Sequence, residues 1–295
     1  MQRVTVAARA GLAGNPSDAY GGAAVAVPVP ALAATVEVVD TPAFRVVGNP
    51  DGAVLVTAAV ARLARRAGVD ERGFELRWST TIPRSVGLAG SSAIVIGTLR
   101  AAAARWGVTL APQELARMAL AVEVEDVGIA AGLMDRAVQA LGVPVLVDGD
   151  EARPLRVPDD PPSVVVAWRA SAAQSSHAVH GPLRARFDAG DHVVVEAMAE
   201  LAELGREAAQ AIEGGDRESL AGCVRATFLR RLALGIVGPD TLDLVTGLEV
   251  AGLAATSAGS GGSAVGVLPP GMSADRARAL LAGRSDGIVT AELFT

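Results

Sequence analysis

The sequence predicts a folded protein in which strands and helices alternate within two domains. Its 295 residues exceed the roughly 100–200 that one domain usually contains. Hydrophobic residues make up 51% and charged residues 20%, which suffices for a core and excludes a disordered chain. The strongest cluster of turn residues, rich in proline and aspartate, spans 148–162. We therefore expect a domain boundary near residue 158, with domains at 1–158 and 159–295.

The first half is predicted to contain four strands, because these segments are β-branched or alternate apolar with polar residues: 4–9, 23–29, 35–39 and 74–79. Three helices are predicted where apolar residues recur at helical spacing: 56–67, 92–106 and 112–125. Gly68 suits the end of the first helix, and Pro112 and Glu114 suit the first turn of the third.

The second half follows the same criteria. Strands are predicted at 164–168, 263–268 and 287–293. Helices are predicted at 191–213, 216–234, 239–253 and 273–283. No internal repeat of solenoid length interrupts this order.

Composition excludes several classes of function. All 26 basic residues are arginine, which excludes a Schiff-base lysine, a pyridoxal phosphate anchor and a P-loop lysine. The single cysteine, Cys223, excludes a disulfide framework and a multi-cysteine metal site. A net charge of −6 without any basic block argues against a nucleic-acid partner. His177 and His180 lack an evident third ligand, so we predict no metal site there.

Targeting signals are not evident either. The chain shows no basic segment followed by a long apolar one at its beginning, as an export signal would require. The most apolar run, 93–104, is interrupted by Arg100 and is too short to span a bilayer. We therefore expect a cytoplasmic protein without a membrane partner, and the oligomeric state stays open.

The most informative segment is a glycine-rich loop that begins at Pro83 and opens an apolar helix. Gly87 and Gly90 let the backbone approach a ligand, so the loop N–H groups and the helix N-terminus would face a phosphate chain. Taken alone, the segment also fits an ordinary tight turn with a serine cap. The residues expected to contact the nucleotide are Pro83, Gly87, Leu88, Ala89, Gly90, Ser91, Ser92 and Ala93.

Two further loops have a related composition, and in chain order the three are the first loop (9–18), the second loop (83–93) and the third loop (258–264). The segment 258–264 formally matches the dinucleotide pattern G-x-G-x-x-A, but a strand-like segment follows it where that pattern requires a helix. We instead expect Gly259, Ser260 and Gly261 to form a glycine turn that lies against phosphate or closes the active site from the second domain. The segment 9–18 ends in Asn15, Ser17 and Asp18, which suit hydrogen bonds to a polyol and equally suit a turn.

These loops resemble those of the GHMP kinases, and within that family those of the glucuronokinases. The similar stretches are ARAGLAGNPSDAYGG, IPRSVGLAGSSAIV, GIAAGLMDRAVQ and AGSGGSAV. The resemblance implies an α+β fold, with an N-terminal domain like domain 2 of ribosomal protein S5 and a ferredoxin-like C-terminal domain. It also implies an ATP-dependent kinase whose site lies between the domains.

The resemblance assigns the chemistry to particular residues. The catalytic aspartate of the family falls on Asp135, where it would orient or deprotonate the acceptor hydroxyl. Arg9 matches the basic residue beside it. Mg²⁺ would be held by Ser92 and by one of Glu123 and Glu125, because residues two apart on a helix point in nearly opposite directions. Of the two glutamates we prefer Glu123.

The acceptor would contact Asn15, Ser17, Asp18 and Asp135, and glucuronate would also need an arginine for its carboxylate. The candidate arginines are Arg136, Arg169, Arg184, Arg186, Arg230 and Arg231. Phosphorylation of D-glucuronate to D-glucuronate 1-phosphate is the leading hypothesis. The alternatives are another acceptor (a different sugar, a mevalonate-like alcohol or homoserine) and a nucleotide-binding homologue without activity.

Overall fold

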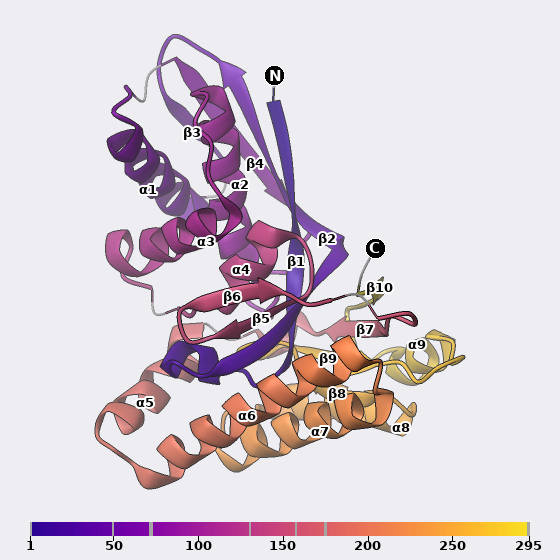
Figure 1. Cartoon of the computed structure of the whole chain (residues 1–295). Coiled ribbons are helices and arrows are strands. Elements are labelled where there is room, and N and C mark those ends of the chain that lie inside the picture. The colour runs from indigo at the N-terminus through magenta and orange to yellow at the C-terminus, as the bar shows by residue number, and fades with distance from the viewer. Residues whose placement is uncertain are drawn as a thin grey trace.

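A computed structural model describes residues 2–48, 50–70, 73–129, 131–156, 158–173 and 176–293, without the side chains of Asp51 and 176–180. The two sheets and the helices that cover them are shown in Figure 1. The helices are α1 (Pro50–Ala67), α2 (Gly90–Arg105), α3 (Pro112–Ala121), α4 (Met134–Leu141), α5 (Ser176–Asp188), α6 (His192–Gly214), α7 (Arg217–Ala233), α8 (Pro239–Val250) and α9 (Asp275–Leu281). The strands are β1 (Gln2–Ala13), β2 (Ala23–Asp40), β3 (Arg45–Val47), β4 (Phe74–Thr80), β5 (Val145–Asp148), β6 (Glu151–Pro154), β7 (Ser163–Trp168), β8 (Ala254–Ser257), β9 (Ser263–Val267) and β10 (Gly287–Glu292).

The first sheet consists, within the described residues, of six strands in the order β3-β4-β2-β5-β6, with β1 paired to β2. The sequence predicts two strands at 23–29 and 35–39, whereas the structure contains the single long strand β2. Its register with β1 shifts between Ala7 and Ala8, which pair with Ala33 and Val29. A bulge of three residues, 30–32, therefore separates the two predicted segments without ending the strand.

The second sheet has the order β10-β7-β9-β8 in the described part, and every pairing in it is antiparallel. The chain passes from the first sheet to the second between Pro154 and Ser163. Each half of the chain thus combines one sheet with several helices, which confirms the predicted α+β class. The boundary near residue 158 stays a prediction, because the largest apolar cluster includes residues from both halves, such as Val138 and Ala202.

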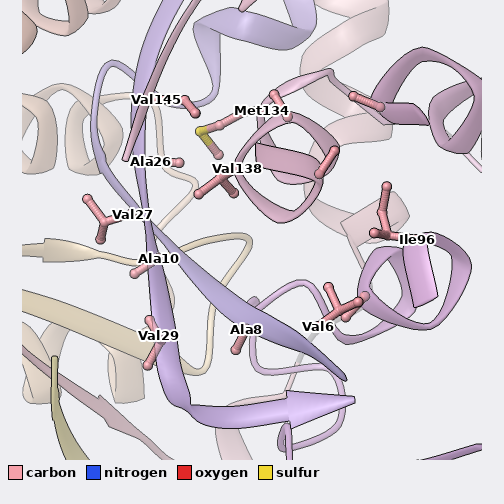
Figure 2. Packing of buried hydrophobic residues seen from close by; sticks show 14 of the residues in the cluster. Val6, Ala8, Ala10, Ala26, Val27, Val29, Ile96, Met134, Val138 and Val145 are labelled. Carbon is pink, nitrogen blue, oxygen red and sulfur yellow. The ribbon is translucent and has the colours of Figure 1, made fainter. Parts of the chain in front are cut away.

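The core beside the first sheet is built mainly from small and β-branched side chains. Figure 2 shows residues of β1 and β2 packed against Ile96 of α2 and Val138 of α4. Small side chains allow close approach between elements, and α6 approaches β2 most closely at Gly205. A Cβ at Gly205 would collide with the backbone carbonyl of Ala23. This contact joins the second half of the chain to the start of β2, next to the first glycine loop.

The remaining predicted elements differ from the structure mostly at their ends. The helix predicted at 112–125 is α3 followed by a π-helical turn, Val122–Asp126. The strands β3, β5, β6 and β8 are not predicted because they are short. Helix α5 is not predicted because its sequence has no clear apolar period and contains Pro182. Among the helices in the described ranges, none has the length and apolar character needed to cross a membrane.

Candidate active site

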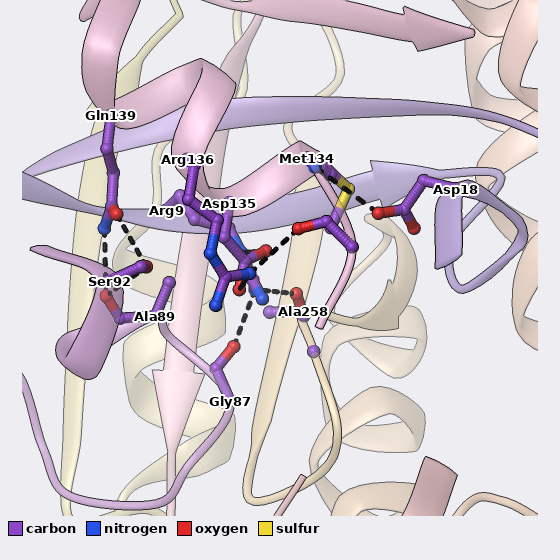
Figure 3. A network of polar contacts seen from close by, with 12 residues as sticks. Arg9, Asp18, Gly87, Ala89, Ser92, Met134, Asp135, Arg136, Gln139 and Ala258 are labelled. Atoms are coloured by element: carbon purple, nitrogen blue, oxygen red, sulfur yellow. Dashed lines mark hydrogen bonds and ion pairs between the residues drawn. The ribbon is translucent and has the colours of Figure 1, made fainter. Parts of the chain in front are cut away.

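The three glycine loops meet at the guanidinium group of Arg9, which lies on β1. Its Nε donates to Oδ1 of Asp135 at 2.6 Å, as Figure 3 shows. Its Nη1 donates to the carbonyl oxygens of Gly87 and Ala258, both at 2.7 Å. The side chain is buried, with Arg9 only 6% exposed. One buried cation therefore connects the first loop, the second loop, the third loop and the N-terminus of α4.

The second and third loops also pack directly on each other. Gly87 has a φ of 77°, in the left-handed region that favours glycine. A Cβ at Gly259 would collide with the carbonyl group of Gly87. On the far side of the third loop, the Ser263 hydroxyl donates to the carbonyl of Val86 at 2.6 Å. The predicted nucleotide residues Gly259, Ser260 and Gly261 thus lie against the second loop.

The second loop ends where α2 begins. Ala89 has a φ of 60°, and helix α2 starts at the next residue, Gly90. The first N–H groups of a helix have no acceptor within it, and the helix dipole adds partial positive charge there. Ser91 at this end is exposed, whereas Ser92 and Ala93 are buried. The geometry of 89–92 is that of a backbone site for an anion such as phosphate.

Gln139 connects this loop to α4, and the sequence analysis missed it. The Ser92 hydroxyl donates to Oε1 of Gln139 at 2.7 Å, and Nε2 of Gln139 donates to the carbonyl of Ala89 at 2.9 Å. Gln139 follows Asp135 by four residues, so both lie on one face of α4. That spacing is the signal by which the sequence could have revealed it.

The two candidate metal-binding glutamates have different surroundings. Glu123 is 0% exposed, and its Oε2 forms an ion pair with Arg136. Its Oε1 is also buried and has no hydrogen-bond partner in the described part of the chain. The side chain of Glu125 is 65% exposed and pairs with Arg62 on α1 at 2.7 Å. Glu123 is thus the one of the two with a buried carboxylate oxygen that has no partner in the described residues, and its role as a metal ligand stays a prediction.

The residues present fit a magnesium ion in part. Arg136 and Gln139, which contact Glu123 and Ser92, stand one turn apart on α4. A carboxylate oxygen and a hydroxyl are hard oxygen ligands of the kind Mg²⁺ prefers, with substrate phosphates completing the shell. Within the described residues, no three His, Cys, Asp or Glu side chains gather into a metal cluster. The ion would therefore be bound mainly through the nucleotide.

The first loop places Asp18 beside the N-terminus of α4. Oδ2 of Asp18 accepts a hydrogen bond from the N–H of Met134 at 3.4 Å, next to Asp135 (Figure 3). Burial, and secondly the negative charge of Asp135, raise the pKa of Asp18 to about 6. The Met134 N–H group and the positive charges of Arg9 and Arg136 oppose this rise. Two carboxylates thus stand close together at one end of the helix.

The other two residues predicted to contact the acceptor differ from each other. Asn15 is buried, and its Oδ1 has no hydrogen-bond donor among the residues that the structure describes. It can therefore accept a hydrogen bond from a bound hydroxyl group. The Ser17 hydroxyl, in contrast, donates to the carbonyl of Ala23 at 2.8 Å. The geometry gives Ser17 a part in shaping the loop, and its predicted contact with the acceptor finds no support.

Comparison with known proteins agrees with this geometry. The sequence model of the GHMP kinases N terminal domain matches residues 54–143. Glucuronokinase 1 of Arabidopsis thaliana is 26% identical over 310 residues, which cover 90% of this chain and 84% of that protein. The protein named probable glucuronokinase 2 of the same organism is 30% identical over 226 residues, covering 69% of this chain and 59% of that protein.

Solved structures show the same fold. The Streptococcus pneumoniae phosphomevalonate kinase in complex with phosphomevalonate and AMPPNP superposes with a TM-score of 0.82 at 16% identity. The match covers 99% of this chain and 100% of that one. The matching family model, the similarity to two glucuronokinases and the shared fold agree with the three loops that meet at Arg9. The chain is therefore a phosphotransferase similar to the GHMP kinases, and its residues 54–143 match the N-terminal domain of that family.

Proposed function

We propose that the protein transfers the γ-phosphoryl group of ATP to the anomeric hydroxyl of D-glucuronate, forming D-glucuronate 1-phosphate and ADP. The observation that carries this proposal is the Arg9–Asp135 ion pair at the point where the three loops meet. The acceptor is inferred from the two glucuronokinases, of which the first is similar over 90% of this chain.

The nucleotide would bind with its phosphates at the N-terminus of α2, against the second and third loops. Backbone N–H groups of 90–92 would hold the phosphate oxygens, in the manner of other helix N-termini. Ser92 and Glu123 would hold Mg²⁺, which would neutralise negative charge on the phosphates of the nucleotide. The buried Oε1 of Glu123, which has no hydrogen-bond partner among the described residues, supports this assignment.

Asp135 would receive the proton of the acceptor hydroxyl as its oxygen attacks the γ-phosphorus. The bond between the γ-phosphorus and the oxygen that bridges to the β-phosphate breaks, and ADP leaves with that oxygen. Arg9 holds the carboxylate of Asp135 at 2.6 Å and fixes its orientation. Positioning and charge stabilisation of this kind supply most of the catalysis in phosphoryl transfer.

The sugar hydroxyl groups would bind to the first loop. Asp18 and the buried Oδ1 of Asn15 are both acceptors, and a sugar offers O–H donors to each. Because Asp18 stands beside Met134 at the start of α4, a ring held by Asp18 would lie next to Asp135. The first loop would thus bring one hydroxyl of the sugar to the catalytic carboxylate.

An acceptor panel tests the proposal. ADP release is measured with D-glucuronate, D-galacturonate, D-glucose, D-galactose, mevalonate and L-homoserine, and the position of the new phosphate is determined by NMR. We expect the highest kcat/KM with D-glucuronate and phosphate at C1. In Asp135→Asn, kcat should fall about 10²–10⁴-fold, the usual contribution of a positioned acid–base group, with nucleotide affinity unchanged.

Other outcomes would contradict parts of the proposal. A higher kcat/KM with a different acceptor would reject D-glucuronate and retain the kinase. Nucleotide binding without ADP release for any acceptor would indicate a homologue that has lost activity. Turnover close to wild type in Asp135→Asn would remove Asp135 from the mechanism.

A further inference from the structure

Arg231 on α7 is a buried arginine beside the site that pairs with carbonyl groups only. It is 1% exposed. Its Nη1 donates to the carbonyl of Asn15 at 3.4 Å, and its Nη2 donates to the carbonyl of Gly259. Its Nε has no hydrogen-bond partner within the described residues. The guanidinium therefore lies between the first loop and the third, and its Nε–H donor is unused among the described residues.

The charge of Arg231 lacks the compensation that the neighbouring buried arginines have. Arg9 pairs with Asp135, and Arg136 pairs with Glu123. For Arg231, no carboxylate of the described chain lies within ion-pair distance. Burial and the nearby charge of Arg9 lower its pKa to about 10, against the attraction of Asp18. It is still protonated at neutral pH, and a buried charge without a counter-ion is costly.

The other arginines that the sequence offers for a substrate carboxylate each have an acidic partner already. The pairs are Arg136 with Glu123, Arg169 with Asp240, Arg184 with Asp188, Arg186 with Asp191, and Arg230 with Glu200. Their charges are compensated without a ligand. Arg231 alone of the six has no such partner among the described residues.

We propose that Arg231 binds the carboxylate of the acceptor, which makes the site selective for a sugar acid over a neutral sugar. This inference rests on the proposed kinase function. An acceptor carboxylate would replace the carbonyl of Asn15 or Gly259 as the partner of the guanidinium. A carboxylate would also supply the counter-charge that the buried guanidinium lacks, which a carbonyl cannot, so the exchange is favourable. The unused Nε–H, together with a neighbouring Nη hydrogen, matches the two oxygens of a carboxylate.

The acceptor is the better source of this anion than the nucleotide. Arg231 contacts the carbonyl of Asn15, in the loop that also carries Asp18. The proposed anion site for the nucleotide is at the N-terminus of α2, and Arg231 faces that side only through the carbonyl of Gly259. Measured separately, the KM values for acceptor and nucleotide distinguish these two sources.

A two-by-two comparison of enzyme and acceptor tests the proposal. Wild type and Arg231→Gln are assayed with D-glucuronate and with D-glucuronamide, which has the same shape and no charge. In wild type, the amide should have a KM about 10–100-fold higher, the range for hydrogen bonds between charged groups. In Arg231→Gln, the KM for D-glucuronate should rise by a similar factor and that for the amide should change little. The KM for ATP should stay within about twofold of wild type.

Two matched variants serve as controls. Arg230→Gln changes the adjacent residue, which is paired with Glu200 and half exposed, and should leave both acceptor KM values unchanged. Arg184→Gln changes the arginine that lies over Tyr20 and donates to the carbonyl of Ala19, beside the first loop. Loss of the preference for D-glucuronate in Arg184→Gln, with retention in Arg231→Gln, would overturn the proposal.

Arg231→Lys addresses the case in which Arg231→Gln does not fold. It keeps the positive charge and loses the planar fork, so the preference for D-glucuronate should decrease and still be present. An equal rise in KM for both acceptors would indicate a purely structural role and overturn the inference. A rise in the KM for ATP alone would assign the anion to the nucleotide and overturn it as well.

Thermal denaturation separates this inference from the proposed function. If D-glucuronate stabilises wild type more than D-glucuronamide does, and Arg231→Lys reduces that difference, the carboxylate site is supported even where no phosphate is transferred. If wild type phosphorylates D-glucuronate and Arg231→Lys retains the full difference, the kinase proposal stands and the role of Arg231 is rejected.

Discussion

The π-helical turn Val122–Asp126 has an inner and an outer face, and arginine–carboxylate pairs occur on both. On the inner face, Glu123 and Arg136 are buried, with side-chain exposures of 0% and 5%. On the outer face, Arg62 of α1 holds Glu125 and Asp126 at the surface. Of these outer residues, Arg62 also lines an open hollow together with Arg66 and Arg117. The residue types are the same and only their access to water differs.

The comparison indicates that burial, rather than pairing, determines how strongly the stability of the protein depends on each of these charges. Exposed ion pairs contribute about 0–1 kcal/mol because water screens them and flexible side chains must be ordered. A buried pair is compensated only while both partners are present, since each charge has lost its hydration. A π-helical turn is often found at functional sites, and here it separates Glu123 from Glu125.

The largest expected effect on stability comes from breaking the inner ion pair. Arg136→Met leaves Glu123 buried without its cation and should lower the free energy of unfolding by about 3–5 kcal/mol. Arg62→Met removes the outer cation and should lower it by about 0–1 kcal/mol. Urea denaturation of both variants measures the difference. The double variant Arg136→Met, Glu123→Met should recover most of the loss, and equal destabilisation by the two single variants would contradict the comparison.

The second prediction concerns the Mg²⁺ concentration that the enzyme requires. Glu123→Gln removes the proposed anionic ligand and should raise the Mg²⁺ concentration for half-maximal activity about tenfold, corresponding to ~1.4 kcal/mol. Glu125→Gln is the matched control on the outer face and should leave the requirement unchanged. The measurement is a magnesium titration of kcat at saturating nucleotide. If both variants behave like wild type, the assignment of the metal to this turn is wrong.

A third prediction compares two aspartates whose pKa values shift in opposite directions. Burial raises the pKa of Asp18 from 3.8 to about 6, so the folded protein binds a proton more readily than the unfolded chain. The free energy of unfolding should therefore fall, by about 2 kcal/mol, as pH rises from 4 to 6. The Arg62 hydrogen bond lowers the pKa of Asp126, whose contribution is lost only as pH falls below its ordinary value.

Two variants measure this contrast by denaturation between pH 4 and 7. Asp18→Asn should remove the fall in stability over that range. Asp126→Asn should leave the fall in place, because Asp126 is ionised in both states there. An unchanged pH dependence in Asp18→Asn would show that Asp18 does not titrate in this range.

Much of the fold could be predicted from the sequence because its longer elements have clear periods. The apolar helix α2 and the alternating strand β4 are where the pattern places them. The short strand β8 could not be found, because a segment of four residues shows too little period and its position depends on pairing with β9. The bulge at 30–32 was missed for a related reason, since only the partner strand β1 reveals that β2 continues.

The residues of the site also fall into two groups, those that sequence motifs could predict and those that only the tertiary structure shows. The loops that carry Arg9 and Asp135 were identified from glycine spacing and family resemblance, and the structure brings the two side chains into contact. The partners Gln139 and Arg231 depend on tertiary packing. Arg231 contacts Asn15, from which 216 residues separate it along the chain, and no local pattern records such a contact. Sequence offered Arg231 only as one of six arginines.

The hydrogen bond between Arg9 and the carbonyl of Ala258 closes a loop of 249 residues. During translation at about 5–20 residues per second, roughly 10–50 s pass between the synthesis of its two ends. A nascent chain on the ribosome therefore carries the nucleotide loop well before the third loop exists to pack against it. A product of premature termination before residue 258 lacks that wall of the site entirely. We therefore expect phosphoryl transfer only from chains that extend beyond the third loop, because shorter ones lack the Ala258 carbonyl that Arg9 contacts.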